Sequence, residues 1–283
     1  MKRLYQISIF LLVIGLVSGC SNTGRRSMEN NIRFDSIALD KKFHYHDVVT
    51  NPECSLKMKF VYPCEYQDDK TLKQLQRQFN TSFFGEEYAI RPVQEAMQAF
   101  ANETVDDFNN NLSLLEDGKE FEADGETAAN SENLQAQWLD AENKVLYNAN
   151  GLISLSIIRS EFVGGAHPDH SIKNQVISLN GGVKVQESEI FTEGYESELA
   201  KIIVKAIADY RQVSVSELED LGYFSVNEIA PNKNFYVDDT GITYTFNYYE
   251  IAPYAVGATT VTIPYGKIRH LMRPENPIAS IAF

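Results

Sequence analysis

The chain has 283 residues, 43% of them hydrophobic, and its 39 acidic against 25 basic residues give a formal net charge of -14. This length and apolar content suffice for one large globular domain or two small ones, and they exclude a chain that is disordered throughout. We find no internal repeat, which excludes a solenoid. The negative charge argues against nucleic acid, whose phosphates need basic side chains, and against electrostatic docking on anionic lipid. Cationic partners are favoured instead.

The N-terminus has the pattern of a secretory signal. Two basic residues precede an apolar run over residues 7–17, which is too short to span a bilayer and leads to small residues before Cys20. The ending Val17-Ser18-Gly19-Cys20 resembles a bacterial lipobox, which implies cleavage before Cys20 and attachment of lipid to its thiol. The alternative is a plain secreted protein. We expect a chain anchored to a bacterial membrane, outer or inner, on its periplasmic or outer surface.

The first half of the chain predicts one strand and two helices. Apolar residues alternate with other residues from Leu56 to Tyr62, which is typical of a strand with one buried face, and Pro63 is expected to end it. Acidic residues at 68–69 then open a helix that Gly85 closes. After Pro92, apolar residues form one stripe of a long amphipathic helix that ends near residue 118. The acidic residues that follow, up to residue 133, predict a mobile loop.

The second half is dominated by predicted strands. Three of them cover roughly residues 134–148, 151–163 and 171–179, with Asn-Gly turns of hairpin type between and after them. Apolar residues from Leu199 to Tyr210 predict another amphipathic helix, and residues 214–221 a short one. Alternation around Tyr244 and Val261 predicts a closing antiparallel pair.

Strands and helices therefore come in blocks, which indicates an α+β fold of antiparallel sheets with packed amphipathic helices. The expected organisation is a signal peptide, a tether and two α+β subdomains, over residues 1–19, 20–35, 36–165 and 166–283.

Two cysteines, Cys54 and Cys64, invite a disulfide in an oxidising compartment. Ten steps of a strand separate their Cα atoms by about 33 Å, whereas a disulfide needs less than about 7 Å. We therefore predict that they are not bonded to each other.

Two stretches resemble a known family. Val163-Gly164-Gly165-Ala166-His167-Pro168 is the first, and the second is Tyr249-Glu250-Ile251-Ala252-Pro253-Tyr254-Ala255-Val256-Gly257 with Thr262-Ile263-Pro264-Tyr265. Both are similar to the paired domains of unknown function in the extracellular part of RsiV-like anti-sigma factors, which sense lysozyme. Similar domains precede some peptidoglycan deacetylase modules. The resemblance covers roughly residues 36–272 and implies a lysozyme or another cationic protein as partner.

The loop after residue 163 holds the strongest candidate site. His167, Asp169 and His170 lie in a His-x-Asp-His pattern that could bind zinc if His44 and His46 joined it from one face of a strand. Zinc needs three or four converging ligands, so we favour a turn in which the glycines permit positive φ and the histidines bind the backbone. We predict no metal and no cofactor. The loop could still line a binding groove.

A second candidate site is electrostatic. Residues 101–142 contain twelve acidic side chains and a single basic one. The stretch is expected to begin on the solvent face of the long helix, near Glu103, Asp106 and Asp107, and to continue into a loop. The alternative is a solvated stretch that only aids solubility. The loop residues expected to steer a cationic partner are Glu120, Glu122, Asp124 and Glu126.

The remaining patterns do not indicate catalysis. Asp238-Asp239 resembles a paired-aspartate motif, but its place between two strands predicts a hairpin turn. Tyrosines near the end of the chain could stack on sugars or pack on the sheet. No sequence motif of a nucleophile elbow, phosphate loop, dinucleotide loop or zinc helix occurs. The sequence thus predicts a non-enzymatic recognition protein of the envelope, and the alternative is a wall-glycan accessory domain or hydrolase that uses the loop of His167, Asp169 and His170.

Overall fold

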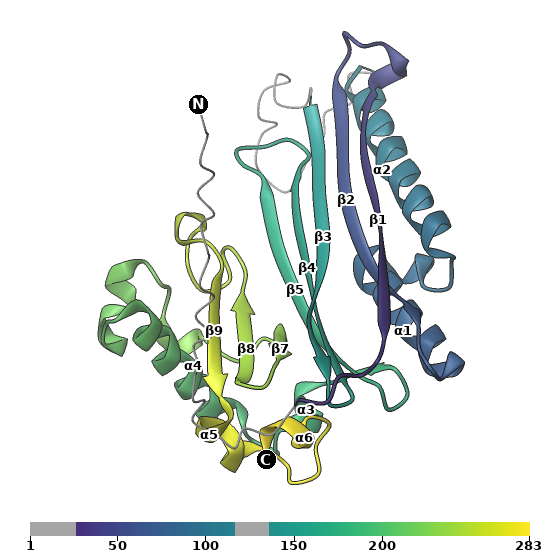
Figure 1. Cartoon of the computed structure of the whole chain (residues 1–283). Helices are drawn as coiled ribbons and strands as arrows, with labels where there is room; N and C mark the ends of the chain where they lie inside the picture. The colour runs from purple at the N-terminus through teal and green to yellow at the C-terminus, as the bar shows by residue number, and fades with distance from the viewer. Residues whose placement is uncertain (1–26, 117–135) are drawn as a thin grey trace, which may run out of the picture.

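The computed structural model describes residues 27–116 and 136–283 as an α+β fold with two sheets (Figure 1). The larger sheet has six strands whose spatial order follows the chain. Its neighbours are antiparallel except β2 and β3, which run parallel. The predicted α+β class is therefore confirmed. The strands are β1 Arg33–His44, β2 Glu53–Glu65, β3 Ala136–Ala149, β4 Leu152–Phe162, β5 Asp169–Ser178 and β6 Val183–Lys184.

Two helices, α1 Asp69–Phe83 and α2 Val93–Glu116, lie in the connection from β2 to β3. A parallel pair needs such a crossover because its strands start at the same end of the sheet. The Asp68 side chain caps α1 by accepting hydrogen bonds from the backbone N–H groups of Lys70 and Thr71. Both helices were predicted from their apolar stripes, and both are confirmed.

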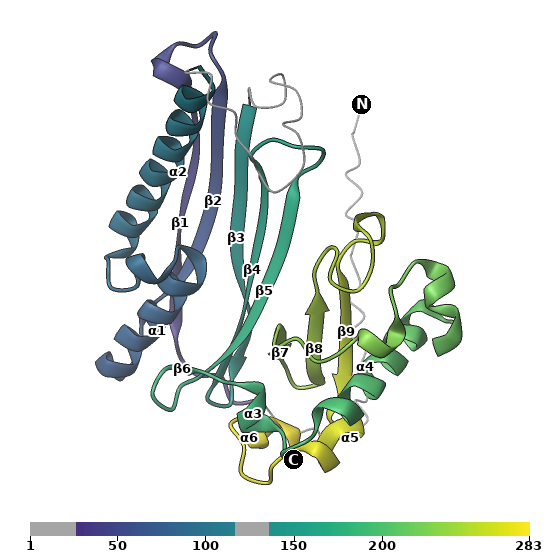
Figure 2. The ribbon, with the colours of Figure 1, turned by 180° about the vertical axis from the view of Figure 1, so that it is seen from behind.

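The helices cover one face of the sheet because that face carries the buried residues of β2 (Figure 2). Leu56, Met58 and Phe60 are buried there, together with Phe79 from α1 and Phe108 from α2. These five side chains belong to one apolar core under the helices. Burial of each side chain of this size contributes about 1.5–3 kcal/mol, so this core fixes the position of the helix pair.

Pro63 does not end its strand, contrary to the prediction. It pairs with Phe34 in the last part of β2, where the register of β1 shifts. The pairing of β2 with β3 extends only to Lys59, so β3 needs no N–H from position 63. Proline is tolerated at such an edge position.

The second sheet consists of β7 Phe235–Val237, β8 Gly241–Phe246 and β9 Thr259–Pro264, all antiparallel. The predicted closing pair is confirmed as β8 and β9. All six residues of β8 are buried, because the sheet packs against α4 Glu196–Arg211 and also lies beside β5. In contrast to its predicted place in the apolar stripe of α4, Tyr210 is 66% exposed.

Short helical turns complete the chain. The predicted helix over residues 214–221 is a pair of 3-10 turns, opened by Ser214 and Glu217 in a capping box. The short α-helices are α3 Glu187–Ile190, α5 Tyr265–Ile268 and α6 Ala279–Ala282. The 3-10 turns are Tyr45–Asp47, Glu86–Tyr88, Val215–Glu217, Glu219–Leu221, Val226–Glu228, Tyr254–Val256 and Arg269–Leu271.

Asparagine side chains join the two sheets. Asn234 accepts a hydrogen bond from the N–H of Asn174 in β5 (2.7 Å) and donates to the carbonyl of Ile172 (2.9 Å). Asn247 accepts from the N–H of Ile172 (2.7 Å), so two side-chain amides bind backbone groups of β5 where, among the described residues, no further strand pairs with it. Ser154 adds a hydrogen bond to the carbonyl of Val237 (2.6 Å). Figure 1 shows the result, with the small sheet beside β5.

Two predicted boundaries, after residue 35 and after residue 165, fall within the large sheet and its turns. Residues 28–35 of the expected tether are part of the fold, since β1 begins at Arg33 and the Asn30 side chain donates to Asn148 and to the carbonyl of Leu152. The expected division between residues 165 and 166 lies in the turn between β4 and β5, which are paired neighbours. The large sheet thus extends across that division.

Cys54 and Cys64 are free thiols at opposite ends of β2, which confirms that they are not bonded to each other. Burial raises the pKa of Cys54 to about 11, with a smaller effect of Glu53, so its thiol is unreactive at neutral pH. In the part of the chain that the structure describes, no helix has the length and apolarity needed to cross a membrane.

Candidate functional site

The two stretches that carry the family resemblance meet in space. The Nε2 of His167 lies 3.0 Å from the Tyr249 hydroxyl, and the His167 ring stacks on Tyr254 with 4.1 Å between ring centroids. Tyr248 and His170 pack beside them, with centroids 5.2 Å apart. We call these five residues the His–Tyr cluster. The cluster connects the β4–β5 turn to the loop between β8 and β9. His167 and Tyr249, which are in contact, lie 82 residues apart in the chain.

The β4–β5 turn presents His167 through its two glycines. Strand pairing ends at Glu161 and Asp169, and Gly164 and Gly165 have φ of 111° and 105°. Only glycine adopts these angles without strain, so the prediction of positive φ at this strand exit is confirmed. The Nδ1 of His167 lies 3.0 Å from the carbonyl oxygen of Pro168, which agrees with a histidine bound to the backbone.

The loop between β8 and β9 is stabilised by hydrogen bonds of Glu250. The Glu250 carboxylate accepts hydrogen bonds from the N–H of Asn247 and the side chain of Asn232, both at 2.7 Å. Tyr254 donates to the carbonyl of Pro168 (3.2 Å) and thereby ties the two loops together. Between these anchors Tyr249 adopts a positive φ of 61° and is 55% exposed. A bulky residue in this conformation is uncommon and costs about 1–3 kcal/mol, which the surrounding hydrogen bonds offset.

The residues predicted for this site have different environments. His167 and Asp169 are exposed, whereas His170 is half-buried and its Nδ1 lies 2.8 Å from the Ser160 hydroxyl. Sequence reasoning did not assign Ser160 to the site, because no motif marks it. A histidine that acts as the base for a serine nucleophile is oriented by a hydrogen bond to a carboxylate. Within residues 27–116 and 136–283, no carboxylate is hydrogen-bonded to His170.

The cluster is aromatic, and the neighbouring Asp169 carboxylate acts on its Tyr254. Partial desolvation raises the pKa of Tyr254, and the neighbouring Tyr248, Tyr249 and Asp169 raise it further. Exposed aromatic faces beside a carboxylate can bind a cationic group, with about 0.5–1 kcal/mol for each exposed cation–π contact.

His44 and His46 do not share a strand face, contrary to the alternative weighed for zinc. β1 ends at His44, and His46 lies in the following 3-10 turn with a positive φ of 55°. Over the described ranges, no three histidine, cysteine, aspartate or glutamate side chains come together in a metal-binding arrangement.

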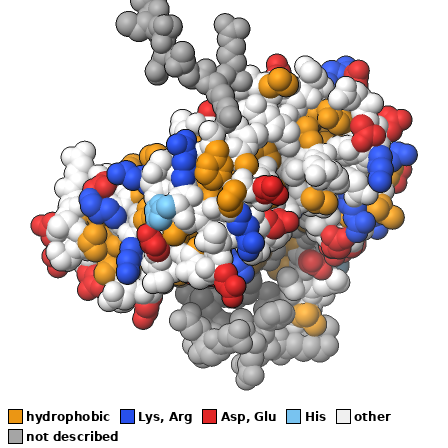
Figure 3. All heavy atoms as spheres, turned by 90° about the horizontal axis from the view of Figure 1, so that it is seen from below, with side chains coloured by type: hydrophobic (Ala, Val, Ile, Leu, Met, Phe, Trp, Pro, Cys, Tyr) orange, Lys and Arg blue, Asp and Glu red, His pale blue; other side chains and the backbone are white. Residues whose placement is uncertain are grey.

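The acidic stretch is described only in part. Glu103, Asp106 and Asp107 are exposed on α2, as predicted, and the Glu103 carboxylate accepts a hydrogen bond from Tyr88. Figure 3 shows another face, seen from below, where basic and acidic side chains are interspersed. The predicted residues Cys20, Glu120, Glu122, Asp124 and Glu126 lie outside the described residues.

Comparison with known proteins gives a domain and a fold. Residues 188–266, which extend from α3 into α5, match the model of a family described as protein of unknown function, DUF3298. No curated protein matches the chain.

Two crystal structures are similar over most of their length. A member of the DUF3298 family from Bacteroides fragilis is 27% identical, with a TM-score of 0.80 over 91% of this chain and 99% of that one. A DUF3298 family protein from Pseudomonas aeruginosa is 14% identical, with a TM-score of 0.56 over 86% of this chain and 95% of that one. The second likeness concerns the fold alone.

Proposed function

We propose that this chain is a lipid-anchored recognition protein of the bacterial cell envelope, and that the His–Tyr cluster binds a cationic protein such as a lysozyme. The observation that carries this proposal is the exposed Tyr249 ring next to His167, with the Asp169 carboxylate acting on the same cluster. An arginine or lysine of the partner would lie over the Tyr249 face and pair with Asp169.

The charge of the whole chain supports the same partner. A net charge of -14 attracts a cationic protein over distances of about a Debye length, which is about 30 Å at 0.01 M salt and 8 Å at 0.15 M. We propose that Glu120, Glu122, Asp124 and Glu126 contribute to this steering. They would act on the association rate more than on the dissociation rate.

A wall glycan is the second candidate ligand. The stacked rings of His167 and Tyr254, together with the exposed Tyr249, form aromatic faces of the kind on which sugars stack. Binding of an uncharged glycan would depend little on ionic strength, whereas binding of a basic protein would weaken with salt.

Titration of the Tyr249→Ala variant with lysozyme tests the proposed site, and loss of affinity is expected.

The lipid anchor has its own test. Cys20→Ala removes the thiol that the lipobox resemblance assigns to lipid, so the variant is expected to move from the membrane to the soluble fraction. Two or three acyl chains give durable attachment, which a chain without them lacks. Fractionation of cells and immunoblotting measure the effect, with Cys64→Ala as a control that leaves the membrane fraction unchanged. Membrane retention of the Cys20→Ala variant would contradict the anchor.

A further inference from the structure

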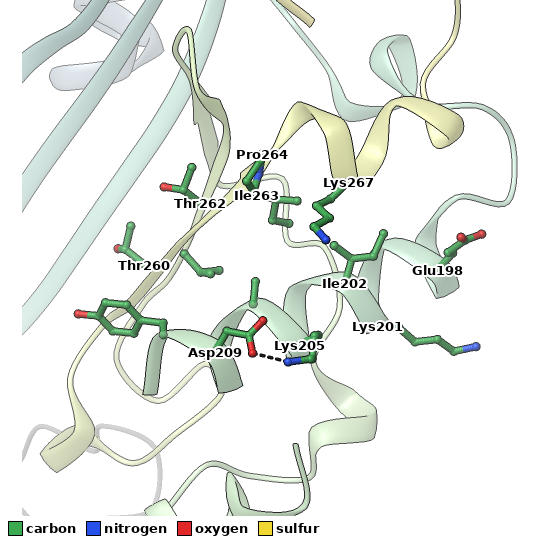
Figure 4. A pocket seen from close by; sticks show the side chains of 13 residues that line it. Glu198, Lys201, Ile202, Lys205, Asp209, Thr260, Thr262, Ile263, Pro264 and Lys267 are labelled. Carbon is green, nitrogen blue, oxygen red and sulfur yellow. Dashed lines mark hydrogen bonds and ion pairs between the residues drawn. The ribbon is translucent and has the colours of Figure 1, made fainter. Parts of the chain in front are cut away.

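A groove of about 850 Å³ lies between α4 and β9 and shares no lining residue with the His–Tyr cluster (Figure 4). One wall is an apolar stripe of α4, in which Ile202, Ala206 and Tyr210 recur at every fourth position. The other wall consists of residues 260–264 of β9, including both buried and exposed positions. Because side chains of both strand faces line the groove, the groove follows the edge of the strand.

One edge of β9 pairs with β8, and the other edge faces the groove. In the part of the chain that the structure describes, β8 is the only strand that pairs with β9, and it does so along all six residues. In an antiparallel pair, every second residue directs its N–H and C=O groups away from the partner strand. Those groups of β9 therefore face the side without a neighbouring strand, where a further strand can bind.

The charges along the groove favour an acidic occupant. Lys205 pairs with Asp209 of the same helix, and Glu198 lies 2.7 Å from His270. The dashed line in Figure 4 marks the first of these pairs. Lys201 and Lys267 have no ion-pair partner within the described ranges, although acidic residues outnumber basic ones in the chain. Two unpaired ammonium groups beside a groove are complementary to carboxylates.

We infer that the α4–β9 groove binds an extended acidic peptide segment of a partner protein, which adds to β9 as a further antiparallel or parallel strand. The N–H and C=O groups of the peptide pair with the open edge of β9. Its side chains alternate, so one set lies on Ile202 and Ala206 while carboxylates of the peptide reach Lys201 and Lys267. This site involves α4, β9 and α5, and it is independent of the ligand proposed for the His–Tyr cluster.

The experiment uses the chain over residues 21–283 and three fluorescently labelled octapeptides. The first alternates glutamate and valine, the second replaces glutamate by lysine, and the third carries N-methyl groups at every second peptide bond of the first. Fluorescence anisotropy measures affinity, and hydrogen exchange measures protection of residues 259–264. We expect the first peptide to bind and to protect this strand, and the other two to bind at least tenfold more weakly.

The matched variants exchange the same number of charges inside and outside the groove. Lys201→Glu with Lys267→Glu is expected to raise the dissociation constant of the first peptide at least tenfold. Lys41→Glu with Lys73→Glu, two exposed lysines of β1 and α1, is expected to leave it unchanged within a factor of two. Circular dichroism confirms that both variants are folded.

Several outcomes would overturn the inference. Equal binding of the N-methylated peptide would show that β9 adds no strand, and equal binding of the lysine peptide would show that the groove does not select acidic chains. If the first peptide does not bind at millimolar concentration, Lys201 and Lys267 would serve instead to protect a strand edge against aggregation. Self-association of the chain that Lys201→Glu with Lys267→Glu abolishes, without peptide binding, would make a second copy the occupant.

Discussion

Replacing Gly241 by alanine is expected to lower the free energy of unfolding by about 3 kcal/mol or more. A Cβ atom at this position would lie 2.1 Å from the carbonyl oxygen of Ile263 and 2.8 Å from its carbonyl carbon. Both atoms belong to the backbone of β9, which cannot rotate away as a side chain can. The strand must therefore shift, although its Ile263 side chain is fully packed in the core.

The matched control is the same substitution at Gly266, in α5. No heavy atom lies within 4 Å of a Cβ added there, and alanine favours a helix over glycine by about 1 kcal/mol. Urea unfolding followed by circular dichroism compares the two variants. A Gly241→Ala variant as stable as the Gly266→Ala variant would contradict the packing of β8 on β9.

Replacing Glu187 by alanine is the second large effect, with an expected loss of about 3 kcal/mol. This carboxylate is 2% exposed and accepts hydrogen bonds from the Tyr195 hydroxyl (3.0 Å) and the N–H of Lys233 (3.1 Å). Alanine leaves the buried Tyr195 hydroxyl and the partly buried N–H of Lys233 without their acceptor and creates a cavity. The exposed Glu193 is the control, and Glu193→Ala is expected to change stability by less than about 0.5 kcal/mol.

The raised pKa of Glu187 predicts that the free energy of unfolding depends on pH. Burial raises the pKa of Glu187 above its ordinary value of 4.5, and its hydrogen bonds offset part of this shift. Because the folded-state pKa is raised, the stability that protonation of Glu187 adds is fully present below about pH 4.5 and is lost as the pH rises through the folded-state pKa. The Glu187→Gln variant lacks this titration. Its unfolding free energy, measured by urea between pH 4 and 8, is expected to fall less with rising pH than that of the wild type, and equal slopes would contradict the shift.

Local structure was predictable where a short pattern decides it. The alternation of Leu56, Met58 and Phe60 predicts a half-buried strand because the side-chain period of a strand is two. The capping of α1 by Asp68 and the hairpin turn at Asp238 follow from the chemistry of single side chains. Each of these features depends on residues within a few positions of one another.

Long-range contacts were not predictable in this way. The parallel pairing of Leu56 with Leu139 follows a crossover of two helices, and no local pattern determines which strands become neighbours. The contact of His167 with Tyr249 requires the asparagine bridges between β5 and the small sheet, which the sequence does not reveal. The exposure of Tyr210 likewise depends on a groove between elements that are distant in the chain.

The most direct test of the proposed function is titration of the lipid-free chain, residues 21–283, with lysozyme by calorimetry and stopped-flow fluorescence. We predict saturable binding whose association rate falls about tenfold between 0.01 M and 0.15 M salt, since screening shortens the range of attraction. Tyr249→Ala is expected to raise the dissociation constant about tenfold, whereas Tyr210→Ala, at an exposed tyrosine outside the cluster, is expected to leave it unchanged. Absence of binding, or binding that neither salt nor Tyr249→Ala alters, would contradict recognition of a cationic protein at this site.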